Sequence, residues 1–431
     1  MLHHRSQIFL IGIFKKCNLM TSSSLKPIER WKISDWPNET NLHGNINCFN
    51  YYDKFKLILD VRSPCEFAVD HIPRAVNIPI LENDERAKVG LTYSKSNPLA
   101  ARLLGSSLIM RNLSRYLEKG GILYETLLSR IEKPNDRILV YCWRGGQRSK
   151  SVAIVLSEIG INQQPVSVLD GGYKFYRKLV IENLKLTPNH IAFIGICGLT
   201  GTGKTKILNY LKSHGEIVLD LENLAEHKGS LFGSHINDIE LSENLIIKQL
   251  SQKLFESKLN EELNNILRKS PVDSRRTSDN KLIVWVECES RKIGNVHLPM
   301  EIWNLLEQCK RIIINVPKEE RIRHIISDYS YWTSKEYYQA TYHIINWLSK
   351  NNCKSLVCHW SRLLENGQFE ELVDSLLTEH YDPIYSRNRR KYSESGDENR
   401  VVKFNVDSLD GNFLESSVCS QLIDLSQRFL K

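Results

Sequence analysis

The feature that most constrains the fold is a short apolar run that leads into a glycine-rich loop and then into an amphipathic stretch. The run His190–Cys197 (HIAFIGIC) precedes GLTGTGKT, which fits the spacing GxxxxGK[ST], and KILNYLKSHG follows. This order predicts a buried strand, a phosphate-binding loop and a helix within an α/β sheet. Loop N–H groups surround phosphate oxygens, the lysine neutralises them, and the hydroxyl residue can bind Mg²⁺. The residues predicted to bind phosphate are Gly198, Gly201, Gly203, Lys204 and Thr205.

The carboxylate on the metal side of this loop has more than one candidate. Asp220 follows the apolar run EIVL, and Glu287 and Glu289 follow LIVWV. The ends of parallel strands meet at one edge of a sheet, so each acid can lie near the loop. Each can equally be a satisfied structural acid, and the sequence leaves the choice open. No tightly bound cofactor and no metal ligands are predicted, although Thr205 could bind Mg²⁺.

A reactive cysteine is predicted in the first half of the chain. The apolar run Arg137–Tyr141 ends in CWRGGQRS, and a helical pattern follows. Loop N–H groups and a helix dipole at the end of a strand favour negative charge, so they favour a thiolate at this position. Cys142 is therefore the predicted catalytic residue. The loop residues expected to support it and its anionic substrate are Arg144, Gly145, Gly146, Arg148 and Ser149.

The arginines and glycines of this loop have separate expected roles. Arg144 and Arg148 add positive charge, which lowers a thiol pKa and holds an anion beside the sulfur. The Cys-x5-Arg spacing lets the loop curl around a tetrahedral anion while Arg148 reaches back to it. Gly145 and Gly146 allow the left-handed backbone angles that such a curl needs. The alternative is a buried strand-end cysteine beside two solvated arginines.

Strands that alternate with helices predict an α/β chain with mostly parallel sheets. At about 100–200 residues per domain, 431 residues make two or three domains. The polar segment Asn183–Asn189 separates the two motifs, so we predict a first domain over residues 29–185 and a second over 186–431. Residues 1–28 carry basic but no acidic side chains. We interpret them as an N-terminal extension outside the fold, with an organelle transit peptide as the alternative.

Apolar runs and periodicity also locate individual elements. The predicted strands are Lys56–Val61, Arg137–Tyr141, Val166–Leu169, His190–Cys197, Glu216–Leu219, Leu282–Val286, Arg311–Val316 and Val401–Val406. The predicted helices include Gln147–Ile159, Lys204–Ser213, Glu240–Leu267 and Ser361–Thr378. No run approaches the roughly 18 apolar residues of a spanning helix, so no membrane partner is expected. Ten cysteines without CxxC spacing indicate a reducing compartment, and we expect a cytoplasmic protein.

Two strings in the first half resemble the rhodanese family. LILDVRSPCEFAVDHIPRAVNIP spans residues 57–79, and LDGGY spans residues 169–173. The residues that carry the match in the first string are Asp60, Arg62, Glu66, His71, Pro73, Asn77 and Pro79. The resemblance covers about residues 50–180 and implies that Cys142 accepts sulfur or selenium as a persulfide or perselenide. We interpret Asp60 and Arg62 as structural support and Cys65 as a bystander.

The pairing of a rhodanese-like half with a phosphate loop resembles one family in particular, the bacterial-type tRNA 2-selenouridine synthases. The strings that carry this resemblance are CWRGGQRS at 142–149, DLENLAEHKGS at 220–230, ECESRKIG at 287–294 and YDPIY at 381–385. The candidate second-site residues within them are Asp220, Glu222, His227, Lys228, Glu287, Glu289 and Arg291. The family usually has NHRGS where this chain has EHKGS. Lys228 thus keeps the charge of an arginine but loses its bidentate fork.

The resemblance implies a specific reaction. A member of this family replaces the sulfur of wobble 2-thiouridine in tRNA with selenium from selenophosphate, through a geranylated thiouridine made from geranyl diphosphate. The phosphate loop would then hold a diphosphate without NTP hydrolysis. A tRNA partner is also suggested by a basic stretch with flanking tyrosines, since cations bind phosphates and rings stack on bases, although charge runs are often only solvated surface. The cationic members of this stretch are Arg387, Arg389, Arg390 and Lys391.

Two other functions fit the same residues. One is a sulfur-responsive P-loop kinase or NTPase, in which the rhodanese half senses or delivers sulfur and Lys204 binds ATP. The other is a tRNA-binding adaptor without activity, which the intact Cys142, Arg148, Lys204 and Thr205 argue against. The formal net charge of +8 permits an anionic partner in each case.

Overall fold

The computed structural model describes residues 54–95, 97–133, 135–160, 166–227, 249–270, 274–288, 290–328, 353–385 and 400–430, with short segments at 29–31, 239–240, 246–247 and 341–342 and the single residues 345 and 348. The chain divides into two compact units, Met1–Leu179 and Val180–Lys431. Helix α7, Gly172–Leu186, runs through this division and continues into a 3-10 turn, Thr187–Asn189. The polar segment that we predicted as the domain boundary is therefore helical.

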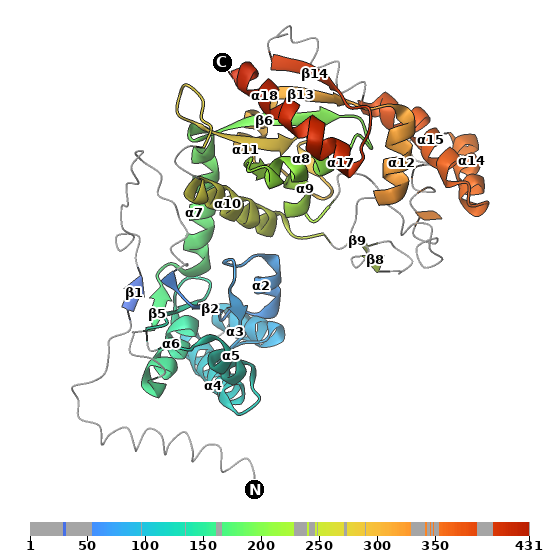
Figure 1. Ribbon diagram of the computed structural model, residues 1–431. Coiled ribbons are helices and arrows are strands. Elements are labelled where there is room, and N and C mark those ends of the chain that lie inside the picture. Colours follow the sequence, from blue (N-terminus) through green and yellow to red (C-terminus); the bar gives the residue numbers. More distant parts are fainter. Residues whose placement is uncertain are drawn as a thin grey trace. The chain divides into compact units, whose positions relative to one another are not determined.

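The first unit is built on a five-stranded parallel sheet with the strand order β1-β5-β4-β2-β3. Strands β1, β5 and β2 of this sheet are labelled in Figure 1. Its strands are β1 Glu29–Trp31, β2 Leu57–Asp60, β3 Val76–Asn77, β4 Ile138–Tyr141 and β5 Ser167–Leu169. Its helices are α2 Pro64–Val69, α3 Asn83–Lys95, α4 Pro98–Leu117, α5 Ile122–Arg130, α6 Gln147–Ile159 and the greater part of α7. Strands β2 and β4 are buried at every position, as expected of central strands in a parallel sheet that is covered on both faces.

The register of β2 and β4 brings two distant parts of the sequence together. Asp60, the last residue of β2, lies opposite Tyr141, the last residue of β4. The segments that leave these strands, with Arg62 on one and Cys142 on the other, therefore start side by side at the same edge of the sheet. Leu59 and Val140, both fully buried, anchor this edge in the core.

The second unit contains another five-stranded parallel sheet, with the order β14-β13-β6-β10-β7. Its strands are β6 Ile191–Gly198, β7 Val218–Leu219, β10 Leu282–Glu287, β13 Lys310–Asn315 and β14 Val401–Asn405. Two short antiparallel ribbons join β8 Ile239–Glu240 to β9 Ile246–Ile247 and β11 Lys292–Ile293 to β12 Val296–His297. Its helices are α8 Lys204–Ser213, α9 Leu221–Leu224, α10 Gln252–Lys269, α11 Met300–Glu307, α12 Lys318–Asp328, α14 Lys354–Glu365, α15 Phe369–Leu376, α17 Gly411–Phe413 and α18 Cys419–Leu430, with π-helical turns η7 Leu377–Tyr381 and η9 Leu414–Val418.

The central strand β6 lies between β10 and β13, and its C-terminal end becomes the glycine-rich loop. Glu287 lies opposite Ile196 at the end of β10, so this acid is placed beside the loop by strand register alone. The core beneath this edge includes Trp285, whose indole Nε1–H donates to a Glu216 oxygen at 2.7 Å.

Both halves have the predicted α/β architecture, but two predicted helices have different limits. The segment predicted as one helix over 240–267 contains β-ribbon residues first, and α10 begins only at Gln252. The segment predicted over 361–378 is two helices, α14 and α15, separated at Gly367, which has a φ of +69°. Within the described part of the chain, no helix is long and apolar enough to cross a bilayer.

Candidate active site

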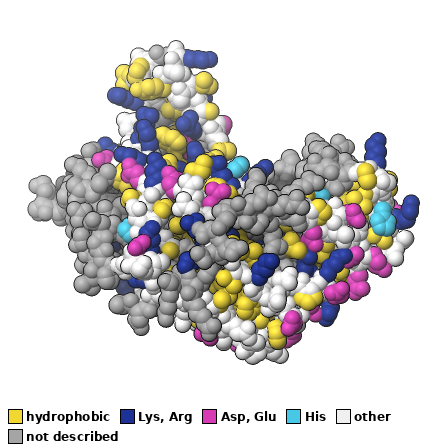
Figure 2. Space-filling view, turned by 90° about the horizontal axis from the view of Figure 1, so that it is seen from above, with side chains coloured by type: hydrophobic (Ala, Val, Ile, Leu, Met, Phe, Trp, Pro, Cys, Tyr) yellow, Lys and Arg dark blue, Asp and Glu magenta, His cyan; other side chains and the backbone are white. Residues whose placement is uncertain are grey.

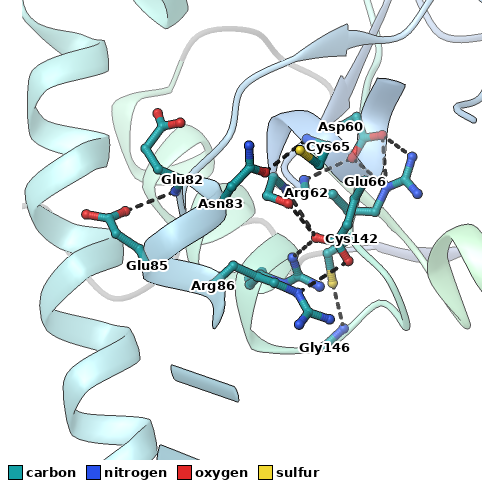
Figure 3. A network of polar contacts seen from close by, with 12 residues as sticks. Asp60, Arg62, Cys65, Glu66, Glu82, Asn83, Glu85, Arg86, Cys142 and Gly146 are labelled. Atoms are coloured by element: carbon teal, nitrogen blue, oxygen red, sulfur yellow. Dashed lines mark hydrogen bonds and ion pairs between the residues drawn. The ribbon is translucent and has the colours of Figure 1, made fainter. Parts of the chain in front are cut away.

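The sulfur of Cys142 lies at the start of helix α6, directly after strand β4 (Figure 3). The Gly146 N–H donates to Sγ at 3.2 Å, and the Ser149 hydroxyl lies 3.3 Å from Sγ. The Ser149 hydroxyl also donates to the Gly146 carbonyl at 3.1 Å. Cys142 is only 3% exposed, so the sulfur combines a buried position with one backbone N–H donor, while the Ser149 hydroxyl proton is given to the Gly146 carbonyl.

Close backbone contacts hold the cysteine loop in place. The Tyr173 N–H donates to the Cys142 carbonyl at 2.8 Å. A Cβ on Gly172 would lie 2.2 Å from the same carbonyl oxygen, and a Cβ on Gly145 would lie 2.4 Å from the Leu169 carbonyl oxygen. The LDGGY turn and the cysteine loop can therefore pack this closely only because residues 145 and 172 are glycines. A Cβ on Gly146 would meet no atom within 4 Å, so open space adjoins the loop at the residue whose N–H faces the sulfur.

The two loop arginines differ in their surroundings. The Arg148 Nη1–H donates to the Glu66 carboxylate at 2.8 Å. Arg86 lies 3.8 Å from the other oxygen of Glu66 (Figure 3). Burial raises the pKa of Glu66, but hydrogen bonding and charge from Arg148, with smaller help from Ser63 and Arg86, outweigh it and hold the pKa below its usual value. Arg148 thus ties the start of α6 to α2, and Arg144 is exposed. We expected Arg148 to reach back to a bound anion; in the structure it is paired with Glu66.

The interpretation of Asp60 and Arg62 as structural support agrees with their contacts. They form a fully buried pair in which the Arg62 Nη2–H donates to Asp60 at 2.6 Å and also to the Asp70 carbonyl at 2.6 Å. The guanidinium lies 4.0 Å from the centroid of the Tyr173 ring. Cys65, by contrast, is exposed, and its N–H donates to Asn83.

The second unit brings three predicted residues together at the phosphate loop. Glu287 is 3% exposed and Lys204 is 9% exposed. The Lys204 Nζ lies 3.2 Å from one Glu287 carboxylate oxygen, and the Thr205 hydroxyl donates to the other at 3.0 Å. Gly201 and Gly203 have φ angles of +81° and +68°, as the curl of a phosphate loop requires. Of the candidate acids that the structure describes, Glu287 is therefore the one that contacts the loop.

The other candidate second-site residues have separate positions. Asp220 accepts from the Asn223 N–H at 2.9 Å and caps α9, and Arg291 is exposed. The Glu222 carbonyl accepts from the His227 N–H at 3.0 Å. The predicted residues that lie outside the described part are Lys228, Glu289, Arg387, Arg389, Arg390 and Lys391. On the face drawn in Figure 2, basic side chains are interspersed with acidic and hydrophobic ones.

A glutamine that the sequence analysis missed joins two of the family-like strings. The Gln249 Nε2 group donates to the Ala225 carbonyl at 2.7 Å and to the Ile293 carbonyl at 3.2 Å. Beside it, His227 is 7% exposed and packs so tightly on Gly294 that a Cβ there would lie 2.7 Å from the imidazole. Gln249 precedes α10 without a recognisable motif, so only the fold reveals its role.

Comparisons with known proteins match both units. A family model described as tRNA 2-selenouridine synthase AAA domain matches residues 191–357, and a rhodanese-like domain model matches residues 50–178. A relative from Salmonella enteritidis named tRNA 2-selenouridine synthase is 33% identical over 356 residues, which cover 76% of this chain and 87% of that protein. The chain belongs to the tRNA 2-selenouridine synthase family.

Some matches to relatives of the same name are shorter. A relative of the same name from Nitrosomonas europaea (strain ATCC 19718 / CIP 103999 / KCTC 2705 / NBRC 14298) is 34% identical over 276 residues, and the match spans 63% of each protein. Less than two thirds of that relative's length is thus covered. A solved structure, the N-terminal domain of a putative ATP/GTP binding protein from Clostridium difficile 630, is 35% identical and covers 29% of this chain and 88% of that chain, with a TM-score of 0.25.

Proposed function

We propose that this chain is a tRNA-modifying transferase that replaces the sulfur of wobble 2-thiouridine with selenium from selenophosphate. The observation that carries the proposal is that this member of the family contains both a buried, hydrogen-bonded thiol and a phosphate loop. The thiol of Cys142 is met by the Gly146 N–H, and Lys204 and Thr205 both contact Glu287. The relatives named tRNA 2-selenouridine synthase support the formation of 2-selenouridine in tRNA.

In this proposal the phosphate loop serves the first step. The sulfur of 2-thiouridine attacks the first carbon of geranyl diphosphate, a C–S bond forms, and the C–O bond to diphosphate breaks. Lys204 and the loop N–H groups stabilise the departing diphosphate, because they offer positive charge and donors at the end of β6. The geranylated sulfur is then a better leaving group than the original thiocarbonyl.

Cys142 serves the second step as an attacking group. Selenophosphate carries selenium at the oxidation level of selenide, so a perselenide on Cys142 would require a two-electron oxidant. A redox-neutral route avoids this requirement: the thiolate displaces geranylthiol from C2, selenium of selenophosphate then displaces the thiolate, and water cleaves the Se–P bond to release phosphate. The Gly146 N–H stabilises the thiolate before its attack and after its departure.

The direct test is mass spectrometry of tRNA nucleosides from cells with and without this chain. Cells with the wild-type chain should contain 2-selenouridine, and Cys142→Ser should abolish it while tRNA binding is retained. Cys65→Ser is the matched control, since Cys65 is an exposed thiol of the same unit. Equal 2-selenouridine in cells lacking the chain would refute the proposal.

One observation favours a nucleotide as the phosphate ligand. The Thr205 hydroxyl and the Glu287 carboxylate lie within 3.0 Å, and together with two phosphates they could hold Mg²⁺, which commonly takes one or two protein ligands. Among the described residues, no group of three or more His, Cys, Asp and Glu side chains is arranged to hold a metal ion. Titrations with ATP and with geranyl diphosphate, each with and without Mg²⁺, separate the two functions. Tight ATP binding with turnover and no binding of geranyl diphosphate would favour the kinase or NTPase.

A further inference from the structure

A buried arginine outside every predicted site touches the phosphate loop. Arg321 lies on α12 and is 3% exposed. Its Nε–H donates to the Thr200 carbonyl of the loop at 2.8 Å. Its two terminal nitrogens donate to the two carboxylate oxygens of Asp382, at 3.0 Å and 2.6 Å. One guanidinium therefore joins the phosphate loop to a carboxylate 61 residues further along the chain.

Other contacts of α12 hold the same loop. A Cβ on Gly201 would lie 2.6 Å from the Ile325 side chain and 3.1 Å from the Arg321 carbonyl oxygen, so α12 packs directly on the loop glycine. Glu320, next to Arg321, accepts from the Leu409 N–H at 3.4 Å, and Leu409 packs on Gly203. The loop conformation thus depends on α12 and on the segment after β14.

Asp382 belongs to the YDPIY string, to which the sequence assigned no role. It lies in the helical turn that follows η7, next to helices α14 and α15, whose packing rests on a core around Trp360 and Leu376. A bidentate Arg–carboxylate pair fixes the guanidinium in orientation as well as position. Asp382 therefore determines where the Arg321 Nε–H points.

We infer that Arg321 is a positioning residue for the phosphate loop and that Asp382 of the YDPIY string sets its orientation. The pair acts through the Thr200 carbonyl, which fixes the peptide units whose N–H groups face the bound diphosphate. It follows that substitutions in the pair weaken phosphate binding although neither side chain has to touch the ligand. The inference rests on the proposed diphosphate binding at this loop and names residues that this binding requires.

The first experiment is calorimetric titration of the full-length protein with inorganic pyrophosphate and with geranyl diphosphate. Arg321→Lys keeps the charge but loses the fork, and Asp382→Asn keeps the shape but loses the charge. Each substitution should lower the affinity for both ligands by about tenfold, which is the effect expected from the loss of one charge-assisted hydrogen bond. The matched controls are Lys318→Met and Asp374→Asn, which remove a half-exposed ion pair between α12 and α15. The controls should bind as the wild type does, and an equal loss in all four variants would overturn the inference.

A charge swap tests whether the pair positions the phosphate loop or only attaches α12 to the turn after η7. The double variant Arg321→Asp/Asp382→Arg restores an ion pair between α12 and the turn after η7, but it offers no donor to the Thr200 carbonyl from α12. Pyrophosphate binding should therefore stay weak in the swap, and recovery to the wild-type affinity would contradict the inference.

Amide hydrogen exchange tests the loop without any ligand. Peptides that cover residues 198–205 should exchange faster in Arg321→Lys and Asp382→Asn than in the wild type and the two controls, because the loop loses an anchor. Unchanged exchange would contradict the inference. If the wild type bound neither pyrophosphate nor geranyl diphosphate, the proposed function would fail, and the exchange data would still decide whether the pair holds the loop.

Discussion

Replacement of Gly172 by alanine tests how the loop around Cys142 is held. Gly172 has a φ of +57°, and its new Cβ would lie 2.2 Å from the Cys142 carbonyl oxygen and 2.5 Å from the Gly145 nitrogen. Both neighbours are backbone atoms and cannot rotate away. The left-handed conformation costs an alanine about 1–2 kcal/mol, and the overpacking adds about 1–3 kcal/mol. We expect a total loss of about 2–5 kcal/mol in the stability of the first unit.

Gly160 supplies the matched control. It caps α6 with a φ of +67°, but a Cβ there would meet nothing within 4 Å. Gly160→Ala should therefore lower the stability of the first unit only by the cost of the left-handed conformation, about 1–2 kcal/mol. The assay is hydrogen exchange of the β4 amides in the full-length protein, where each 1.4 kcal/mol corresponds to about tenfold in exchange rate.

Gly172→Ala should accelerate this exchange more than Gly160→Ala by about fivefold to 150-fold, which corresponds to about 1–3 kcal/mol. It should also reduce the reactivity of Cys142, because the displaced loop moves the Gly146 N–H away from the sulfur. Equal exchange in the two variants would refute the reasoning that close backbone contact fixes this loop.

Two further predictions concern carboxylates. Glu287→Gln should tighten Mg²⁺-free pyrophosphate binding by about tenfold, because the carboxylate no longer competes for Lys204, and weaker binding in calorimetry would contradict this. The lowered pKa of Glu66 means that its pairing with Arg148 contributes fully above the ordinary glutamate pKa of about 4.3 and is lost as the pH falls through the lower value of the folded protein. Stability of the first unit, measured by hydrogen exchange in acid, should fall more steeply over this range in the wild type than in Glu66→Gln, and parallel curves would exclude Glu66 as a cause.

The strands that carry the two reactive loops could be predicted from sequence because each is a continuous apolar run that ends in glycines. The prediction His190–Cys197 differs from β6 by one residue at each end, and Arg137–Tyr141 differs from β4 by one residue at its start. Helix limits were harder to predict. Ser251 caps α10 by accepting from the Leu254 N–H, but an amphipathic pattern continues before it, so the sequence alone does not single out this start.

The pairings of charged side chains around the loops could not be predicted from sequence. Arg148 and its partner Glu66 are 82 residues apart in the sequence, and Arg321 and Asp382 are 61 apart. No local sequence pattern predicts either partner. A charge in a loop attracts any acid that the fold brings near, so an arginine expected to face an anion can be held by a carboxylate. Spacing within one motif predicts the backbone of a site better than the partners of its charges.

The central claim, that the thiol of Cys142 and the phosphate loop serve successive steps of one reaction, is tested most directly with purified protein and thiolated tRNA. The reaction is supplied with geranyl diphosphate and selenophosphate, and the nucleosides are identified by mass spectrometry. The account predicts that Lys204→Ala leaves 2-thiouridine unchanged, whereas Cys142→Ser accumulates the geranylated nucleoside without 2-selenouridine. Production of 2-selenouridine at the wild-type rate by either variant would contradict it.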